Sequence, residues 1–129
     1  VRLEARPGGA AGVGRADFRD LVRVALRLRP DRIVVGEVRG AEAADMVWAL
    51  GTGHDGSMST VHAPTASDAV DRLTSFAVAG ADGAPVDVVR QQVHAALHTL
   101  VGVERRPDGR RVVASLHDLG SDGRLVPVT

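Results

Sequence analysis

The stretch from Arg29 to Ala63 constrains the fold of this chain more than any other feature. It contains an apolar run at residues 32–36 that ends in the single carboxylate of Glu37, followed by a segment long enough for a helix. A glycine-rich turn and a second short run then lead to His62. Parallel strands joined by a helix bring their carboxyl ends to one edge of a sheet, where α/β proteins place ligand-binding side chains. The stretch therefore predicts a strand–helix–strand unit with Glu37 and His62 at the same edge.

The composition excludes several classes of protein. With 129 residues, 44% of them hydrophobic and 25% charged, the chain is expected to form one soluble domain. Zero net charge, two Phe, one Trp and no Tyr argue against a nucleic-acid-binding protein. No apolar run approaches the roughly 20 residues of a membrane span, and the absence of cysteine excludes disulfides and thiolate metal sites.

The chain contains no lysine, which excludes a working Walker A loop within it. A P-loop needs lysine because its ammonium group reaches the β- and γ-phosphates of the nucleotide. The turn from Gly51 to Ser57 matches the glycine spacing, but Ser57 stands where lysine is required and a strand follows instead of a helix. The first residue is Val1 rather than Met, which fits a fragment or a processed product.

Periodicity, capping residues and turn residues predict the order of elements. Asp17 and Thr65 are expected to cap helices, and Pro107-Asp108-Gly109 and Asp122-Gly123 are expected to form turns. The expected elements are strands over 1–6, 32–36 and 57–61, a loop over 7–14, helices over 18–28, 41–50, 66–77 and 85–97, and a three-stranded antiparallel meander after residue 100. The strand over 32–36 is expected to be covered on both faces. These elements predict an α/β fold, with parallel strands and flanking helices over 1–100 and a β-hairpin region of the same domain over 101–129.

Glu37 directly follows the apolar run, where a rigid strand end can hold an anion in place. In phosphoryl-transfer ATPases a carboxylate at this position holds Mg²⁺ through water or orients the attacking water. The alternative is a loop glutamate neutralised by Arg39 or Arg32, both of which are close in sequence. A hydrophobic run ending in glutamate is common, so spacing alone favours this alternative.

His62 ends the second strand and is expected to lie beside Glu37 if the two strands pair. A histidine there can bond a γ-phosphate, and the alternative is a buried histidine bonded to a carbonyl. A metal site formed by His54, Asp55 and His62 is disfavoured, because a turn and the far end of a strand supply these residues.

Charged residues on the predicted helices have simpler interpretations. Arg19, Arg23 and Arg27 recur every four residues and are expected to form a solvated face, with Asp20 as the local partner. Asp45 is expected to be an exposed helix charge, and Trp48 is expected to pack in the core or an interface.

Three segments in the same order resemble the ATPases of type II and type IV secretion and type IV pilus assembly, with most similarity to the tight-adherence pilus branch. They are RLEARP (2–7), RDLVRVALRLRPDRIVVGEVRGAEAADM (19–46) and TGHDGSMSTVHA (52–63). Residues 32–40 resemble the Walker B strand of that family, and residues 52–63 resemble its histidine box. This resemblance favours the functional interpretations of Glu37 and His62 over their alternatives.

The resemblance implies a partial RecA-like P-loop NTPase core that uses ATP and Mg²⁺. It implies catalytic roles for Glu37, linked to Mg²⁺ through water, and for His62 as a γ-phosphate sensor. Arg39, Thr52 and His54 are the implied nucleotide-binding residues. The isolated chain is expected to be inactive, because the Walker A region of the family would precede Val1.

At the level of the whole protein, the resemblance implies a homo-hexamer that couples ATP hydrolysis to protein secretion or pilus assembly. Its partner would be an inner-membrane platform protein, with the ATPase in the cytoplasm and peripheral to the cytoplasmic face of that membrane. The alternative is a truncated, non-catalytic paralogue that acts in ring assembly or binds a secretion partner.

Overall fold

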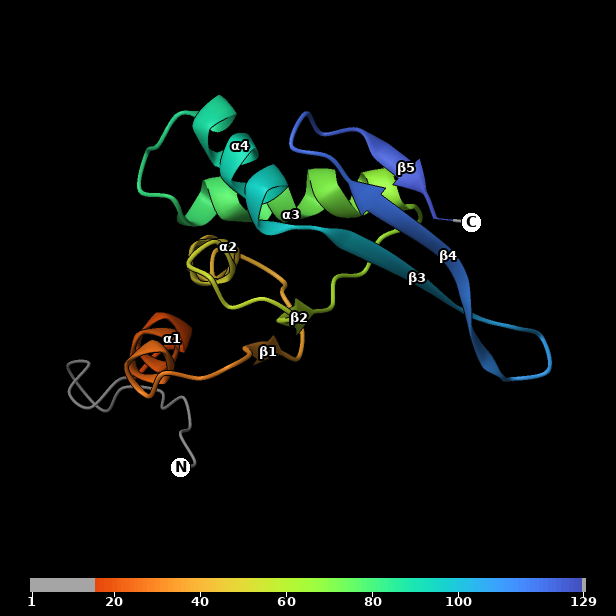
Figure 1. Ribbon diagram of the computed structural model, residues 1–129, viewed down its shortest axis with the longest axis horizontal. Coiled ribbons are helices and arrows are strands. Elements are labelled where there is room, and N and C mark those ends of the chain that lie inside the picture. Colours follow the sequence, from red (N-terminus) through yellow and green to blue (C-terminus); the bar gives the residue numbers. More distant parts are fainter. Residues whose placement is uncertain (1–15, 129) are drawn as a thin grey trace.

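Nine helices and strands follow one another in the part of the chain that the computed structural model describes, residues 16–128 (Figure 1). The helices are α1 (Phe18–Arg27), α2 (Ala43–Leu50), α3 (Ala66–Gly80) and α4 (Val86–Ala96). The strands are β1 (Val34–Val35), β2 (Met58–Ser59), β3 (Thr99–Arg105), β4 (Arg111–Leu119) and β5 (Leu125–Pro127). The strand expected over 1–6 and the loop expected over 7–14 lie outside the described residues.

The predicted strand–helix–strand unit is confirmed. β1 and β2 pair in parallel, with Val34 opposite Met58 and Val35 opposite Ser59, and α2 connects them. The backbone bond from Val38 N to Thr60 O, 3.0 Å long, extends the contact beyond the last paired residues. The carboxyl ends of both strands therefore lie at one edge of the sheet.

The prediction that β1 is covered on both faces was wrong among the described residues. Val35 is 7% exposed, whereas Val34 is 68% exposed and its neighbour Met58 is 60% exposed. Successive side chains of a strand point to opposite faces, so Val35 joins the helix core and Val34 leaves it. One face of the parallel pair thus presents apolar side chains to solvent.

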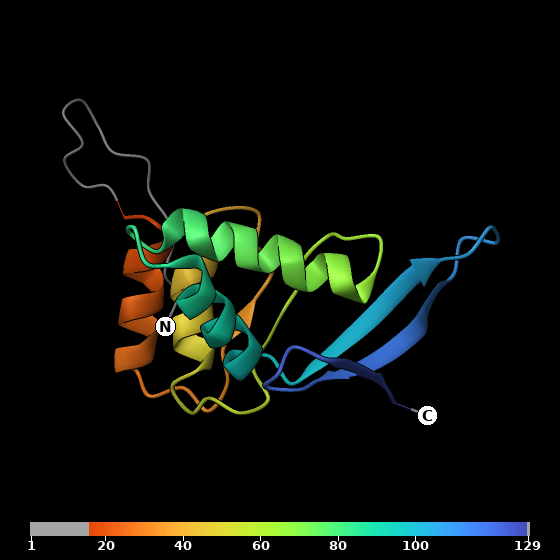
Figure 2. The same cartoon turned by 90° about the horizontal axis from the view of Figure 1, so that it is seen from above.

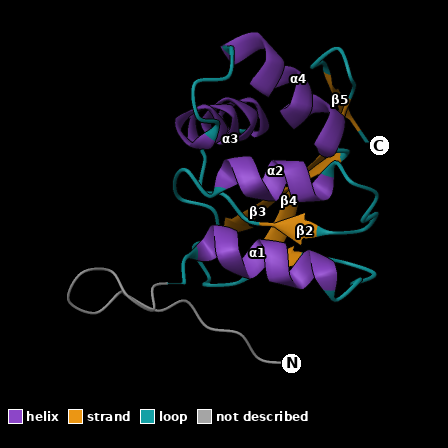
Figure 3. Ribbon diagram, turned by 90° about the vertical axis from the view of Figure 1, so that its left-hand side faces the viewer, coloured by secondary structure: helices purple, strands orange, loops and turns teal. Residues whose placement is uncertain are grey.

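The four helices stack in chain order from α1 to α4 (Figure 3), and each contacts the next. Their apolar faces share one core with Val35 of β1 and with Val38, three residues further along the chain. The core side chains of the helices include Met46, Val47, Leu73, Ala77, Val89 and Val93. The core therefore fixes β1 and α3, the two elements that flank the candidate site, relative to each other.

Both predicted helix caps are confirmed. Asp17 accepts a bond from Asp20 N and Asp20 accepts one from Asp17 N, which together form a capping box at α1. Thr65 accepts a bond from Asp68 N at α3 and donates its hydroxyl proton to the Asp68 carboxylate over 2.7 Å. Asp68 is thereby held at the start of α3.

The prediction of a solvated arginine face was wrong for Arg19, and the prediction that Asp45 is an exposed charge was also wrong. Arg19 Nε lies 2.9 Å from Asp45 Oδ2, and Asp45 is only 18% exposed. The same guanidinium contacts Asp82 Oδ2 at 3.4 Å and donates to the Gly80 carbonyl at 3.0 Å. Asp20 is engaged in the cap instead. Arg19 therefore links α1 to α2 and to the turn after α3.

Replacing Arg19 by Ala is expected to lower the midpoint of thermal unfolding of this chain. The change leaves Asp45 largely buried without its cation and the Gly80 carbonyl without this donor. Circular dichroism during heating measures the effect. Arg23→Ala is the matched control, because Arg23 is exposed on the same helix and has no ion pair among the described residues. Equal midpoints in the two variants would show that the three contacts contribute nothing measurable.

The predicted antiparallel meander is also confirmed, with strand order β3-β4-β5. Gly109 and Gly123 adopt positive φ angles of 86° and 81° in its two turns, a conformation that glycine allows. The β3–β4 hairpin projects from the helices (Figures 1 and 2). The division of the domain after residue 100 stays a prediction. Within residues 16–128, none of the helices has the length and apolar character that crossing a membrane requires.

Candidate functional site

The structure brings Glu37 and His62 together at the carboxyl edge of the parallel strands. His62 Nε2 lies 3.0 Å from Glu37 Oε1. Two bonds hold the strand ends beneath them: Val38 N donates to Thr60 O, and Thr60 Oγ1 donates to Gly36 O over 2.6 Å. The parallel pairing of the two strands places both residues at this edge, as the sequence predicted.

Arg39 binds the second oxygen of the same carboxylate, with its NH2 group 2.7 Å from Glu37 Oε2. The ion pair proposed as the alternative to a catalytic Glu37 is thus present together with the His62 contact. Arg32 lies elsewhere, with its Nε 2.8 Å from the position that a Cβ atom at Gly56 would take. One carboxylate is therefore held between a guanidinium and an imidazole.

The hydrogen bond from Arg39 holds the pKa of Glu37 below its ordinary value. Burial opposes this shift, and the charges of Arg39 and His62 reinforce it. Glu37 is therefore ionised at neutral pH. Because the folded-state pKa is the lower one, the contact stabilises the fold above the unfolded-state pKa, and this stabilisation is lost as the pH falls through the folded-state value.

Glu42 organises the turn between Glu37 and α2, a role that was not predicted from the sequence. Its Oε1 atom accepts bonds from Arg39 N at 2.7 Å and Gly40 N at 3.0 Å. A carboxylate that satisfies free backbone N–H groups just before a helix is a recognisable pattern, so the spacing from Arg39 to Glu42 contained a usable signal. Glu42 fixes the backbone from which the Arg39 side chain extends.

Thr52 and His54 lie at the other end of the parallel strands. Thr52 Oγ1 donates to Ala49 O at 2.7 Å and lies 3.3 Å from His54 Nδ1, in the turn before β2. With a rise of roughly 3.3 Å per residue, the few residues of a strand put about 10 Å or more between this turn and the carboxyl edge. The structure does not bring these two residues to Glu37 and His62, and their nucleotide-binding roles stay predictions.

The disfavoured metal site of His54, Asp55 and His62 is not assembled, because His62 lies at the opposite strand end from the turn. Across residues 16–128, no group of three or more His, Asp or Glu side chains is placed to hold a metal ion. A divalent cation at Glu37 would need water molecules and ligand oxygens to complete its coordination.

Comparison with known proteins identifies relatives over most of the chain. The family described as Type II/IV secretion system protein matches residues 9–114. A protein of Mycobacterium tuberculosis whose name places it in conjugal transfer is 44% identical over 100% of this chain and 36% of its own length. The type IV secretion system protein PtlH of Bordetella pertussis is 39% identical over 67% of this chain and 26% of its own length. The chain thus spans about a third of the length of these relatives, or less.

A solved structure supports the same relationship. The VirB11 ATPase from the Brucella suis type IV secretion system, crystallised in complex with sulphate, matches with a TM-score of 0.66 and 27% sequence identity. The match covers 74% of this chain and 31% of that chain. It confirms the predicted fold class, a partial RecA-like core followed by an antiparallel meander. By sequence and by fold, the chain belongs to the type II/IV secretion ATPase family.

Proposed function

We propose that this chain forms the hydrolytic part of the ATP site of a secretion ATPase. The observation that supports this function best is the 3.0 Å contact between Glu37 and His62 at the carboxyl edge of two parallel strands. Ligands of α/β sheets bind at that edge. The full-length protein would use ATP hydrolysis to drive protein secretion or pilus assembly, and the tight-adherence pilus branch stays a prediction.

Glu37 would orient the water molecule that attacks the γ-phosphate. Its Oε2 accepts a bond from Arg39 and its Oε1 lies 3.0 Å from His62 Nε2, so each oxygen keeps a lone pair that can accept from water. A carboxylate with a lowered pKa is a weak base, so hydrogen bonding to water suits it better than full removal of a proton. The two neighbours fix the direction of those remaining lone pairs.

His62 and Arg39 would face the phosphate groups. Their side chains are 84% and 76% exposed, so part of each remains accessible although each contacts Glu37. The guanidinium has five N–H donors and can bind Glu37 and a phosphate oxygen together. The imidazole can change its partner between Glu37 and a phosphate oxygen, as the predicted sensor role requires.

Glu37 would also hold Mg²⁺ indirectly, through a water molecule. A single carboxylate fits this role, because Mg²⁺ in nucleotide sites keeps several waters and takes its other ligands from phosphate oxygens. The bound cation would neutralise charge on the transferred phosphoryl group.

The test is Mg²⁺-dependent ATP hydrolysis by the full-length protein that contains this chain. We expect phosphate release that requires Mg²⁺, and none from the isolated 129-residue chain, which has no lysine to serve a P-loop. Failure of the full-length protein to bind or hydrolyse ATP would overturn the proposal. The non-catalytic module would then be the better interpretation.

Exposed apolar side chains support association of this chain with another protein surface, in both the catalytic and the non-catalytic interpretation. Val34, Met58 and Trp48 are 68%, 60% and 58% exposed. We propose that the full-length protein is a homo-hexamer that works in the cytoplasm, at the cytoplasmic face of the inner membrane, beside a platform protein. Light scattering of the full-length protein with and without ATP tests the hexamer, and a monomer under both conditions would contradict it.

A further inference from the structure

The position of His62 is not explained by its own strand. The last backbone bond between the parallel strands joins Val38 and Thr60, and residues 61–63 have no regular secondary structure. The His62 side chain is 84% exposed, so packing does not hold the ring. A contact that fixes the His62 backbone would keep the ring within reach of Glu37, from which it lies 3.0 Å.

Arg72 supplies that contact from α3. Its NH1 group donates a hydrogen bond to the backbone carbonyl of His62, ten residues earlier in the chain. Bonds from a charged donor are stronger than neutral ones. The helix residues next to Arg72 are fixed, because Leu73 and Thr74 are 4% and 6% exposed. The bond therefore ties the backbone of His62 to the helical core.

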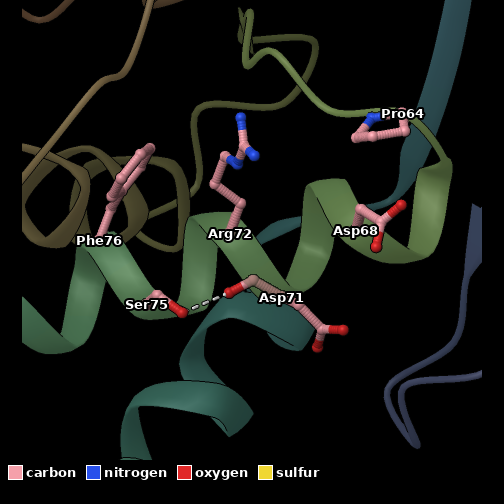
Figure 4. A pocket seen from close by; sticks show the side chains of 6 residues that line it. All are labelled: Pro64, Asp68, Asp71, Arg72, Ser75 and Phe76. Atoms are coloured by element: carbon pink, nitrogen blue, oxygen red, sulfur yellow. Dashed lines mark hydrogen bonds between the residues drawn. The ribbon is translucent and has the colours of Figure 1, made fainter.

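The carboxylates next to Arg72 do not compete for its guanidinium. Asp68, one turn earlier on α3, is engaged with Thr65 in the helix cap. Figure 4 shows Asp71 pointing away from Arg72, while Arg72 points between Phe76 and Pro64 toward the loop above the helix. Within residues 16–128 Arg72 forms no salt bridge, so its described polar contact is the one to His62.

We propose that Arg72 is a positioning residue that holds the His62 ring against Glu37 through the His62 carbonyl. The role rests on the proposed function, since the ring is held for contact with the γ-phosphate. Arg72 itself would touch neither the nucleotide nor the attacking water. The prediction concerns a contact between two parts of this chain, so it can be tested separately from catalysis.

The first measurement is the NMR signal of the His62 ring in the 129-residue chain, assigned with a His62→Ala variant. We expect Arg72→Ala to shift this signal in the same direction as Glu37→Gln, because both weaken the contact between the ring and the carboxylate. Arg72→Lys keeps a cationic donor and is expected to give a smaller shift. The control is Arg90→Ala, an exposed arginine on α4. If Arg72→Ala leaves the His62 signal unchanged, as the control is expected to do, the proposal is overturned.

The second measurement is a double-mutant cycle on ATP turnover by the full-length protein. Arg72→Ala is expected to lower kcat by roughly 10- to 100-fold in the wild-type background. In the His62→Ala background it is expected to have no further effect, because the backbone carbonyl remains but the ring is gone. Equal losses in both backgrounds would assign Arg72 a general structural role and contradict the proposal.

The two measurements separate this proposal from the proposed function. A full-length protein without ATPase activity would end the function proposal, while the NMR comparison would still decide whether Arg72 positions His62. An active protein in which Arg72→Ala leaves both kcat and the His62 signal unchanged would reject only the role of Arg72.

Discussion

Replacing Glu37 by Gln in the full-length protein is expected to lower ATP turnover by roughly 10²- to 10⁴-fold, with binding of Mg-ATP retained. Glutamine keeps the size of the side chain, but it loses the negative charge that binds Arg39, contacts His62 and orients water. Phosphate release under saturating ATP measures the loss. Equilibrium binding of a fluorescent ATP analogue tests whether the site still fills.

Glu104→Gln is the matched control for that experiment, because Glu104 is exposed on β3 in the projecting hairpin. It removes the same charge away from the site and is expected to leave turnover unchanged. Turnover of the Glu37→Gln variant within about twofold of wild type would remove Glu37 from the reaction. A similar loss in both variants would point to an effect of net charge instead.

The strand–helix–strand unit and the meander could be predicted because their signals are local. The apolar run before Glu37, the capping residues and the two turns each specify a conformation within a few residues. Parallel pairing then follows from the intervening helix, and it places Glu37 and His62 at the same edge. The central contact of the site was thus accessible from the sequence.

The burial of individual strand residues could not be predicted in the same way. The sequence shows that Val34 and Val35 are both apolar, but it does not show which face has a covering layer in this chain. The structure buries Val35 under the helices and leaves Val34 exposed. Burial depends on which elements surround a strand, and that is a property of the whole protein.

Side-chain partners that are distant in sequence were also missed. Arg19 contacts residues 26, 61 and 63 positions further along the chain, and no local pattern indicates them. Periodicity on a helix suggests partners three or four residues away, and it therefore favoured Asp20. Arg72 was missed because its acceptor is a backbone carbonyl. Every residue has such a group, so the type of the residue does not indicate the contact.

Replacing Gly80 by Ala is expected to destabilise this chain by roughly 1–3 kcal/mol. Gly80 is the last residue of α3, and a Cβ atom there would lie 2.0 Å from the Ala41 carbonyl oxygen and 3.0 Å from Ala44 Cβ. Alanine favours a helix by at most about 1 kcal/mol over glycine. The overlap with a backbone oxygen outweighs that gain, because a carbonyl cannot rotate away as a flexible side chain can. Urea unfolding of the 129-residue chain measures the change.

Gly36→Ala is the control, because nothing lies within 4 Å of a Cβ atom at Gly36 and its φ angle is not in the left-handed region. It makes the same chemical change beside the parallel strands and is expected to be close to neutral. In the Gly80→Ala variant the added methyl group would meet Ala41, which lies in the turn that Glu42 holds between Arg39 and α2. The contact between α3 and this turn should therefore weaken in that variant. Equal stability of the two variants would mean that α3 and the turn can separate at little cost.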